Sequence, residues 1–588
     1  MAILWKTPMI ISPIQYRKYF SFPTAPTAVL IGTAFMVGIG GGLGAVLFRW
    51  LIRLFTHIFF ERIPIFLAFI GDYSIILVPA IGALFFSPLI YFFAREAKGH
   101  GVPEVMEAIE LKGGRIRPVV GVIKSLASSL CIGSGGSVGR EGPIVQIGSA
   151  IGSTIGRLLH FSDERIKNLV ASGAASGIAA TFNAPIGGVF FALEVIMRDF
   201  STKRLGAVVI ASVTASVIGR IFLGNKPSIA VPPYTLNTPV ELLFYLGFGL
   251  LLVPFCVLFI QFIYKSEDLF NKLHVHELNK PILGGLLLGG IGFFYPQVFG
   301  VGYENIDNAV YNTLPVQLML LLIPLKIIAV SLTLGSGGSG GIFAPSLVLG
   351  ALIGGGLGNF LAYIFPHLGI EPGAYAIVGM GAFFAGAAQA PITAILILFE
   401  LTGDYLIILP LMLAVTITTL AVEKLHPESI YTLKLVRRGI NLRQEMRRDI
   451  LENIQVKEIH MKDIPSLQPS ATIDTILIAF EKGVHGAIPV IEKDGTFHGL
   501  ISTNEILTSL IYKDSLKNLV VAEDLARLGT FVEENDNLND ALKKFIEAEN
   551  DVLPVIKREG GKTKLVGIIS RHALLKAYSR EVSVRQDE

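Results

Sequence analysis

Long apolar runs dominate the first three quarters of the chain. Ile65–Phe93 contains one charged residue, Asp72, and Leu242–Tyr264 contains none. Such runs exceed the roughly 20 apolar residues that a helix needs to cross the hydrocarbon of a bilayer. The pattern predicts a multi-pass α-helical membrane domain over residues 27–431, embedded in the lipid bilayer. The basic side chains of residues 1–26 favour a cytoplasmic N-terminal segment.

Glycine and proline break these runs at short intervals. They cluster in Gly133–Pro143, Gly173–Gly188 and Gly335–Gly356, so many of the helices should be short or interrupted. Backbone that leaves the helical conformation at membrane depth is stable only where protein buries it or where it lines a polar cavity. The pattern therefore predicts a buried polar site inside the membrane domain.

The membrane domain contains an internal repeat. Gly133–Pro143 recurs in similar form as Gly335–Pro345, at an offset of 202 residues. The similarity continues, at an offset of 206, in two further pairs: Asn183–Pro185 with Gln389–Pro391, and Glu194 with Glu400. We therefore expect two homologous halves, about 27–223 and 240–431, with an ion site between their broken helices.

The last part of the chain also repeats. In each copy an amphipathic helix precedes two short apolar strands. The paired strand segments are His485–Val490 with Asp551–Val555, and Gly499–Ser502 with Gly567–Ser570. This pattern predicts a cytoplasmic tandem α+β module over residues 454–588, with copies at about 454–513 and 514–580. A basic connector at 432–453 would join it to the membrane domain.

Charge follows the same division. The chain of 588 residues is 52% apolar and 16% charged, but residues 441–588 hold 44 of its 95 Asp, Glu, Lys and Arg side chains. Neither part indicates a nucleic-acid partner. The two cysteines, Cys131 and Cys256, lie in apolar stretches, and the membrane part has no phosphate-binding loop, paired-histidine zinc motif or carboxylate cluster. We expect neither an enzyme nor a metal protein, and no required cofactor.

Four segments share one design, in which small residues lead into a proline that can open a helix. They are Gly99–Pro103, Gly139–Pro143, Gly341–Pro345 and Asn183–Pro185. Helix N-termini offer unpaired N–H groups and a partial positive charge, so several that converge would bind an anion without a formal counter-charge and release it again. We expect a small anion as the substrate; close helix packing through small residues is the alternative interpretation.

Together these motifs resemble the CLC family of chloride channels and chloride/proton antiporters, and the tail resembles the paired CBS domains that many members carry. Gly99–Pro103, Gly139–Pro143 and Gly341–Pro345 are similar to the three signatures of the family. The resemblance implies a homodimer in a prokaryotic cell membrane, in which each subunit has its own chloride path built from two inverted repeats.

By this resemblance Glu141 is the gating glutamate, whose carboxylate imitates an anion in the outer site and withdraws when it is protonated. The resemblance places the other anion-binding groups at Gly99, His100, Gly101, Arg140, Gly142, Ile342, Phe343 and Tyr431. Of these, Ile342 and Phe343 would offer backbone N–H groups to a central anion, and Tyr431 its hydroxyl.

Two residues depart from the family pattern. His100 stands where serine is common, and its imidazole can donate to an anion when neutral and attract one when protonated, so we expect an acid-sensitive conductance or selectivity. Val195 stands where proton-coupled members commonly carry a proton-transferring glutamate. Because valine cannot relay protons, the sequence favours a passive chloride channel, with a chloride/proton antiporter as the alternative. Glu194, one residue earlier, fits a structural role better.

The tail resembles modules that bind ATP or another adenine nucleotide through a serine or threonine and an acidic residue three positions later. Ser502 and Glu505 match this pattern, whereas Ser570 is followed by Ala573. We expect nucleotide regulation or, alternatively, a tail that only stabilises the dimer. In a third interpretation the membrane part is a receptor or scaffold that reports nucleotide status and carries no anion flux.

Overall fold

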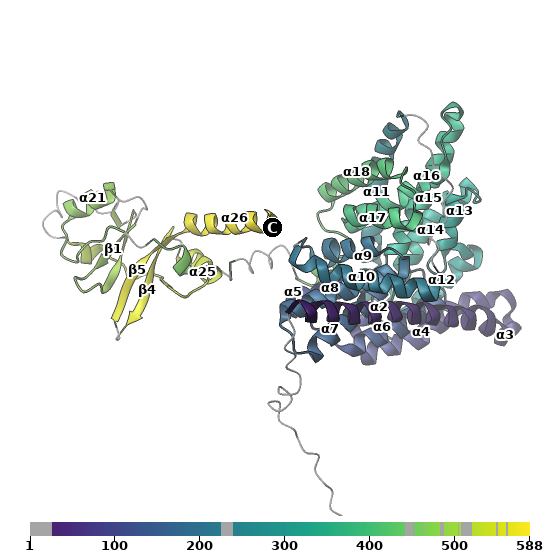
Figure 1. The fold of residues 1–588 in the computed structure, drawn as a ribbon, viewed down its shortest axis with the longest axis horizontal. Coiled ribbons are helices and arrows are strands. Elements are labelled where there is room, and N and C mark those ends of the chain that lie inside the picture. Colours follow the sequence, from purple (N-terminus) through teal and green to yellow (C-terminus); the bar gives the residue numbers. More distant parts are fainter. Residues whose placement is uncertain are drawn as a thin grey trace, which may run out of the picture. The chain divides into compact units, whose positions relative to one another are not determined.

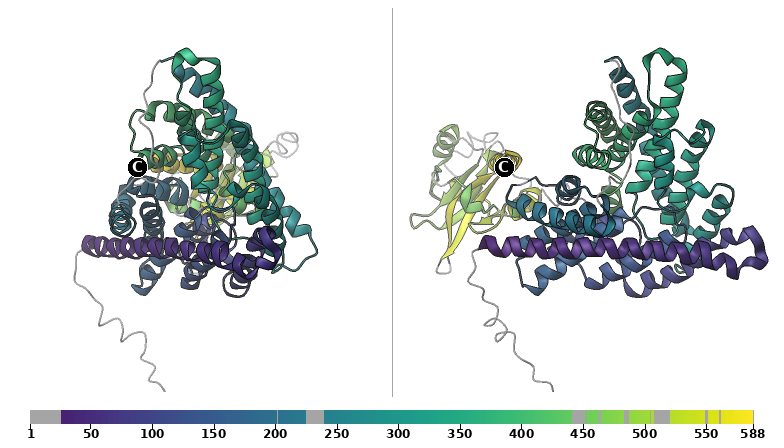
Figure 2. Two further views of the ribbon diagram at one scale, coloured as in Figure 1. Left: turned by 90° about the vertical axis from the view of Figure 1, so that its right-hand side faces the viewer. Right: turned by 45° about the vertical axis from the view of Figure 1, so that its right-hand side comes forward.

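The computed structural model describes residues 26–200, 202–224, 239–440, 451–452, 454–461, 464–482, 487–503, 505–506, 520–548, 551–559 and 562–587. The chain divides into two compact units between Ile440 and Asn441. The first unit is helical, and the second combines helices with small sheets (Figures 1 and 2). The expected N-terminal cytoplasmic segment lies outside the described residues, except for Pro26.

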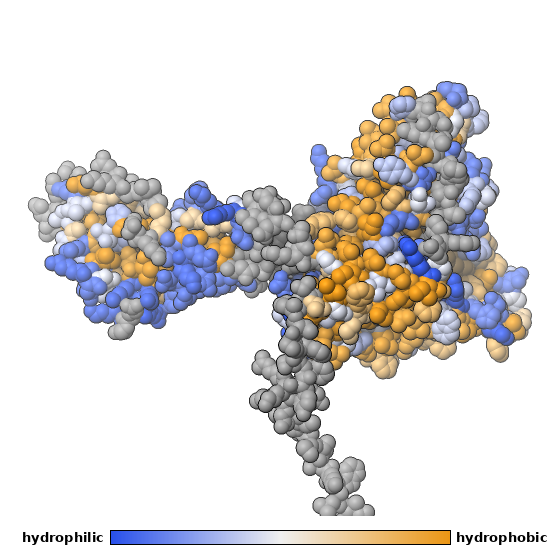
Figure 3. All heavy atoms as spheres, in the orientation of Figure 1, coloured by the Kyte–Doolittle hydropathy of each residue, from blue (hydrophilic) through white to orange (hydrophobic). Residues whose placement is uncertain are grey.

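The first unit has the surface of a membrane protein. Among the described residues, 7 helices are long and apolar enough to cross a bilayer, and shorter apolar helices such as Pro118–Gly133 accompany them. Its surface is largely apolar in Figure 3, and side chains as large as Phe35, Trp50 and Ile221 are exposed on it. Apolar surface of this extent belongs in lipid. This unit, hereafter the membrane unit, is therefore the predicted multi-pass domain.

The helices of the membrane unit fall into two series of the same order. The first series comprises α2 (Pro26–His57), η1 (Ile58–Arg62), α3 (Ile63–Phe66), η2 (Ala68–Tyr73), α4 (Ser74–Phe93), η3 (Arg95–Ala97), α5 (Val102–Leu111), α6 (Pro118–Gly133), α7 (Glu141–Leu158), α8 (Asp163–Phe182), α9 (Pro185–Phe191), η4 (Ala192–Met197) and α10 (Thr202–Leu223). The second comprises α11 (Glu241–Lys272), α12 (Lys280–Phe294), η5 (Pro296–Val298), α13 (Tyr303–Val310), α14 (Val316–Gly335), α15 (Phe343–Ile364), η6 (Pro366–Leu368), α16 (Pro372–Ala388), α17 (Pro391–Thr402), α18 (Ile408–Leu425) and α19 (Thr432–Arg437). Helices α4–α10 thus correspond to α12–α18, as the sequence repeat predicted.

The repeated breaks have a local cause. Asn183 and Gln389 end α8 and α16 in the left-handed conformation, with φ of 58° and 53°. Two residues later Pro185 and Pro391 begin α9 and α17, where the missing proline N–H is not needed. The same pair of residues, a left-handed helix end followed by a proline, therefore produces the same sharp corner between two helices in both halves.

The two repeated acids fasten the halves to each other. Glu194, in η4, accepts hydrogen bonds from the first turn of α17, and Glu400, in α17, accepts them from the first turn of α9. The N–H donors are Ile392 at 3.1 Å and Thr393 at 2.7 Å for Glu194, and Ile186 at 2.9 Å and Gly187 at 2.6 Å for Glu400. Each carboxylate complements the positive end of a helix, so Glu194 has the structural role that its repeat partner indicated.

The second unit contains the tandem α+β module. Its described elements are η7 (Val456–Glu458), α21 (Ile473–Lys482), β1 (Ala487–Ile491), β2 (Phe497–Ser502), α24 (Ala522–Leu525), β3 (Val532–Glu533), α25 (Leu538–Ala548), β4 (Val552–Glu559), β5 (Lys562–Ser570) and α26 (Arg571–Asp587). Strands β1 and β2 form an antiparallel pair, and β4 pairs with β5 antiparallel and with β3 in parallel. Both hairpins shift register at one point, after Val490 and after Val555, which are equivalent positions of the repeat.

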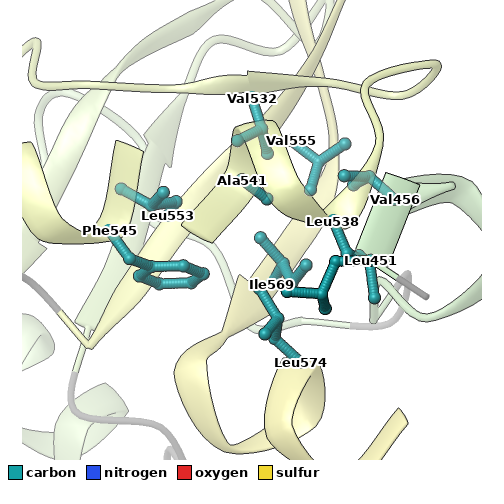
Figure 4. Close-up of a cluster of buried hydrophobic side chains, with 10 residues drawn as sticks. All are labelled: Leu451, Val456, Val532, Leu538, Ala541, Phe545, Leu553, Val555, Ile569 and Leu574. Atoms are coloured by element: carbon teal, nitrogen blue, oxygen red, sulfur yellow. The ribbon is translucent and has the colours of Figure 1, made fainter. Parts of the chain in front are cut away.

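The two halves of the module exchange their leading segments. Leu451 and Val456, which precede the first half, pack in the core of the second half around Phe545 (Figure 4). Ala522, which precedes β3, packs in the core of the first half with Ile488. The expected copies at 454–513 and 514–580 are therefore not self-contained, because each needs apolar side chains from the segment before the other.

The boundary between the units also differs from the expected one. The connector was predicted at 432–453, but α19 lies in the membrane unit, where Leu435 is fully buried. Its basic side chains form ion pairs within that unit, so this segment is not a free linker. Residues 441–450 lie outside the described part of the chain.

Candidate anion site

Loops from both halves meet in the middle of the membrane unit, each at the start of a helix. The loops before α5 and α15 are joined by hydrogen bonds from Gly99 N–H to the Gly338 carbonyl (3.0 Å) and from Gly340 N–H to the Gly99 carbonyl (3.3 Å). The loops before α7 and α15 are joined by a reciprocal pair between Gly139 and Gly341. The loops of the three predicted signatures are therefore joined by hydrogen bonds into one assembly.

Glycine is required where these loops touch. A Cβ added to Gly142 would lie 2.1 Å from the carbonyl oxygen of His100, and one added to Gly341 would lie 2.7 Å from the N atom of Gly142. Neither backbone can move away, because both are held by the hydrogen bonds between the loops. The glycines thus bring the N-termini of α5, α7 and α15 together, as predicted for three of the four motifs. The fourth, Asn183–Pro185, instead begins α9, whose first N–H groups donate to Glu400.

Glu141 occupies the centre of this arrangement. Its side chain is 1% exposed. One carboxylate oxygen accepts a hydrogen bond from the Tyr303 hydroxyl at 3.0 Å, and the other from the N–H of Ala344, in the first turn of α15, at 3.3 Å. A carboxylate held by a helix N-terminus stands where that terminus would otherwise hold a free anion. The gating role of Glu141 stays a prediction.

Tyr303 was missed in the sequence analysis. It begins α13, and the guanidinium of Arg140 lies over its ring at 4.8 Å from the centroid while Arg140 Nε lies 3.8 Å from the Glu141 carboxylate. The signal was present: Gly300 and Gly302 precede Tyr303 in the second half as Gly99 and Gly101 precede α5 in the first. All four glycines have positive φ, so the first signature is also repeated.

The inner part of the site contains the expected central groups. The N–H groups of Ile342 and Phe343 have no backbone acceptor among the described residues, and both residues are buried. The ring of Phe343 packs on Phe384, with centroids 4.3 Å apart. Tyr431 is also buried, and none of the described residues hydrogen-bonds to its hydroxyl. These donors are available to a ligand.

His100 lies beside these groups. Its ring centroid is 6.0 Å from that of Tyr431, and its Nε2 atom is 3.4 Å from the hydroxyl oxygen of Tyr264. The imidazole is 3% exposed, and Nδ1 has no hydrogen-bond partner among the described residues. Together with the charged side chains of Lys98, Glu267 and Lys434 it lines a small cavity.

Two buried lysines correct one expectation, namely that the site would lack formal cations nearby. Lys124 donates to the carbonyl oxygens of Ala97 (3.0 Å) and Gly99 (2.7 Å) in the loop before α5. Lys326, at the repeat offset of 202, makes the equivalent contacts before α13 with two carbonyl oxygens, both at 3.1 Å. Non-helical carbonyl groups in the membrane need donors, and in each half a lysine supplies them.

Ion pairs fix the segment that follows Tyr431. In α19, Lys434 pairs with Glu104 of α5 at 2.9 Å, and Arg438 pairs with the same carboxylate at 3.0 Å. Arg437 pairs with Asp268 of α11. The helix after Tyr431 is therefore clamped to the helix that follows the first signature, which holds the tyrosine against the site.

Val195 is away from these polar groups. It is buried at 5% exposure in η4, and its side chain offers no proton-binding atom. The neighbouring Glu194 is committed to the start of α17 by three hydrogen bonds, the third from the hydroxyl of Thr393 at 2.6 Å.

In the second unit, the residues expected at the nucleotide site make local hydrogen bonds. The hydroxyl and the N–H of Ser502 both donate to Glu505, the N–H at 3.0 Å. Burial raises the pKa of Glu505, but these hydrogen bonds outweigh it, and the net direction is downward. Ser570 accepts the N–H of Ala573 at 3.1 Å. Ser570 thus caps the start of α26, whereas Ser502 is a donor to its acidic partner Glu505.

The geometry and the comparisons agree on the class of protein. The family described as voltage gated chloride channel matches residues 81–423, and the CBS domain family matches residues 456–512 and 523–580. The chain therefore belongs to the CLC family of membrane proteins and carries two CBS domains, as the sequence motifs indicated.

Individual relatives can be named. The chain is 33% identical over 450 residues to the H(+)/Cl(-) exchange transporter ClcA of Vibrio cholerae, covering 74% of this chain and 94% of that protein. A slow cyanobacterial Cl-/H+ antiporter has a similar structure, with a TM-score of 0.64 and 27% identity over 70% of this chain and 97% of the other. A eukaryotic CLC transporter matches with a TM-score of 0.62 and 21% identity over 93% and 98%, which supports the fold of the whole chain.

Proposed function

We propose that this protein exchanges chloride for protons across a membrane. The observation that carries the proposal is the buried Glu141 carboxylate, held by Tyr303 and the start of α15 in the place of an anion. Such a group can alternate with chloride when ionised and carry a proton when neutral. The relatives named as proton/chloride exchange transporters support exchange rather than the channel that the sequence favoured.

Geometry suggests how the residues would act. Chloride in the central site would contact the free N–H groups of Ile342 and Phe343 and the hydroxyl of Tyr431. These partial charges and dipoles bind an anion weakly enough to release it. An ionised Glu141 competes with chloride for the outer position, and a protonated one leaves it. Anion movement and proton movement are then linked through one carboxylate.

A passive channel is the second candidate, and one observation favours it. Val195 cannot accept a proton where many proton-coupled relatives are expected to carry an acid, and Glu194 is occupied by the start of α17. A channel would need no proton route on the inner side. The two candidates therefore differ in one measurable quantity, the proton flux coupled to chloride flux.

We also propose a homodimer. The starts of α9 and α17, with the exposed side chains of Ile186 and Ile392, lie at the surface of the membrane unit together with the carboxylates that cap them. Partly exposed carboxylates at membrane depth are costly in lipid, and a second copy placed on this surface would cover them. We further propose a bacterial cell membrane with the tail in the cytoplasm, which the bacterial relatives and the basic side chains of α19 support.

The test is a flux measurement on protein reconstituted in liposomes, with chloride and proton concentrations recorded together. Exchange predicts that an imposed chloride gradient drives protons uphill in a fixed ratio. Glu141→Gln should abolish this proton movement while chloride still moves, because an amide cannot take up a proton. Chloride flux without proton movement in the wild type would establish the channel instead, and the absence of any chloride flux would leave the receptor or scaffold interpretation.

Nucleotide binding at Ser502 and Glu505 stays a prediction. Binding of ATP or AMP to the full chain, against a Glu505→Ala control, tests it.

A further inference from the structure

The hydrogen bonds around His100 assign its tautomer. The Tyr264 hydroxyl has one hydrogen, and it donates to the Ile430 carbonyl at 2.6 Å. In the 3.4 Å contact between Tyr264 and His100, Nε2 must therefore be the donor. A neutral imidazole has a single N–H, so Nδ1 carries a bare lone pair.

This lone pair is buried and unused. Nδ1 has no hydrogen-bond partner among the described residues, and with His100 only 3% exposed, bulk water does not replace one. A buried acceptor without a partner is costly, because it has lost its hydrogen bond to water. In this tautomer Nδ1 can take up a proton but cannot donate to an anion, which differs from the neutral donor expected from the sequence. After protonation it becomes a donor that can contact chloride.

The charges around His100 make its protonation and the binding of chloride beside it depend on each other. The positive groups that face it are Lys434 of α19, Arg438 directly after α19, Lys124 of α6 and, across the cavity, Lys98; the negative groups are Glu104 of α5 and Glu267 of α11. The tyrosines Tyr264 and Tyr431 complete its surroundings. Lys434 and Arg438 already share Glu104, so the cations oppose an imidazolium unless an anion lies close to it.

The backbone of His100 also lies against the start of the helix that carries Glu141. The carbonyl oxygen of His100 lies against Gly142, the residue after Glu141, so closely that a Cβ on this glycine would be 2.1 Å from it. The imidazole extends from there towards Tyr431 and the cavity with Glu267. His100 thus contacts both this cavity and the loop that carries Glu141.

We propose that His100 is the inner proton carrier of this exchanger and fulfils the task that Val195 cannot. This inference rests on the proposed exchange. In the step, the imidazolium N–H bond at Nδ1 breaks and the proton passes to the carboxylate of Glu141 once that side chain has left Tyr303. The products are a neutral imidazole and a neutral carboxylic acid, so charge and protons balance. Chloride beside the imidazolium stabilises its positive charge and so favours the protonation of His100.

The test compares the ratio of proton to chloride flux in liposomes for the wild type, His100→Gln and His100→Ser. Glutamine keeps much of the size and the hydrogen bonding of histidine but does not titrate. Serine provides a second variant should glutamine impair folding, which size-exclusion chromatography checks. The matched control is His276→Gln, which changes an exposed histidine that lies against Tyr91.

We expect the ratio to fall by roughly 10²-fold in both His100 variants, the lower end of what a positioned proton donor contributes, and to stay unchanged in the control. The remaining coupled flux of the variants should also lose its dependence on the pH of the inner side. A wild type that exchanges protons and a His100→Gln variant with the same ratio would overturn the inference and leave the proposed function standing. A wild type that moves no protons would overturn both.

Discussion

Replacing Tyr303 by phenylalanine tests whether the contact with Glu141 keeps the outer position closed. The substitution removes only the hydroxyl, which donates to the carboxylate at 3.0 Å, and it keeps the ring beneath Arg140. A hydrogen bond to a charged group contributes about 1.5–3 kcal/mol. Because the phenol stabilises the ionised carboxylate, its loss makes protonation and departure of Glu141 easier by that amount.

The consequence can be measured as the external pH at which chloride flux from liposomes is half-maximal. Since 1.36 kcal/mol corresponds to one pH unit, we expect this midpoint to move upward by about 1–2 units in Tyr303→Phe, with a higher flux at neutral pH. Tyr311→Phe, at the exposed end of the same helix, is the control. An unchanged midpoint, or one shifted to lower pH, would refute the assignment of Tyr303 as the group that holds Glu141 in place.

Three further predictions follow from the contacts. Glu194→Ala and Glu400→Ala should each lower the free energy of unfolding of the detergent-solubilised protein by about 1–3 kcal/mol, because they leave helix N–H groups unpaired. The melting temperature should fall accordingly, and equal melting curves would contradict this. Gly142→Ala should abolish flux, since its Cβ would lie 2.1 Å from a carbonyl oxygen; wild-type flux would show that the loops can separate. The hydrogen bond from Lys562 lowers the pKa of Asp494, so this pair stabilises the two hairpins above about pH 4 and loses its effect as the pH falls further. Asp494→Asn should therefore speed amide exchange of the hairpins in the full chain at pH 7, and the difference should shrink only as the pH falls below about 4 towards the lowered pKa; equal exchange of the two proteins at pH 7 would contradict it.

The features that the sequence predicted well are those with local causes. Glycine and proline punctuation marks the ends of broken helices, so the loops at Gly139–Pro143 and Gly341–Pro345 could be found and placed together from their repetition. The same applies to the hairpins of the tail, whose short apolar runs predicted β1, β2, β4 and β5. In each case, a few adjacent residues determine the backbone conformation.

The features that were missed depend on contacts between distant residues. Tyr303 is 162 positions from Glu141, and no pattern around either residue links them except the repeated glycines. The exchange of leading segments in the tail, where Leu451 packs with Phe545, leaves no local trace either. Apolar residues at a segment boundary show that a surface will be buried, but they do not identify the partner that buries it.

The preference for a channel shows why a single substituted position is weak evidence about mechanism. Val195 shows that one side chain cannot carry a proton, but coupling requires only that some titratable group connects the inner side with Glu141. The same sequence that lacks an acid at 195 has an imidazole at 100, where a non-titrating side chain is common in the family. Under the proposed role of His100, whose Nδ1 has no partner among the described residues, the two departures are linked. One loss and one gain of a proton-binding group are what an exchanger with a relocated proton route would show.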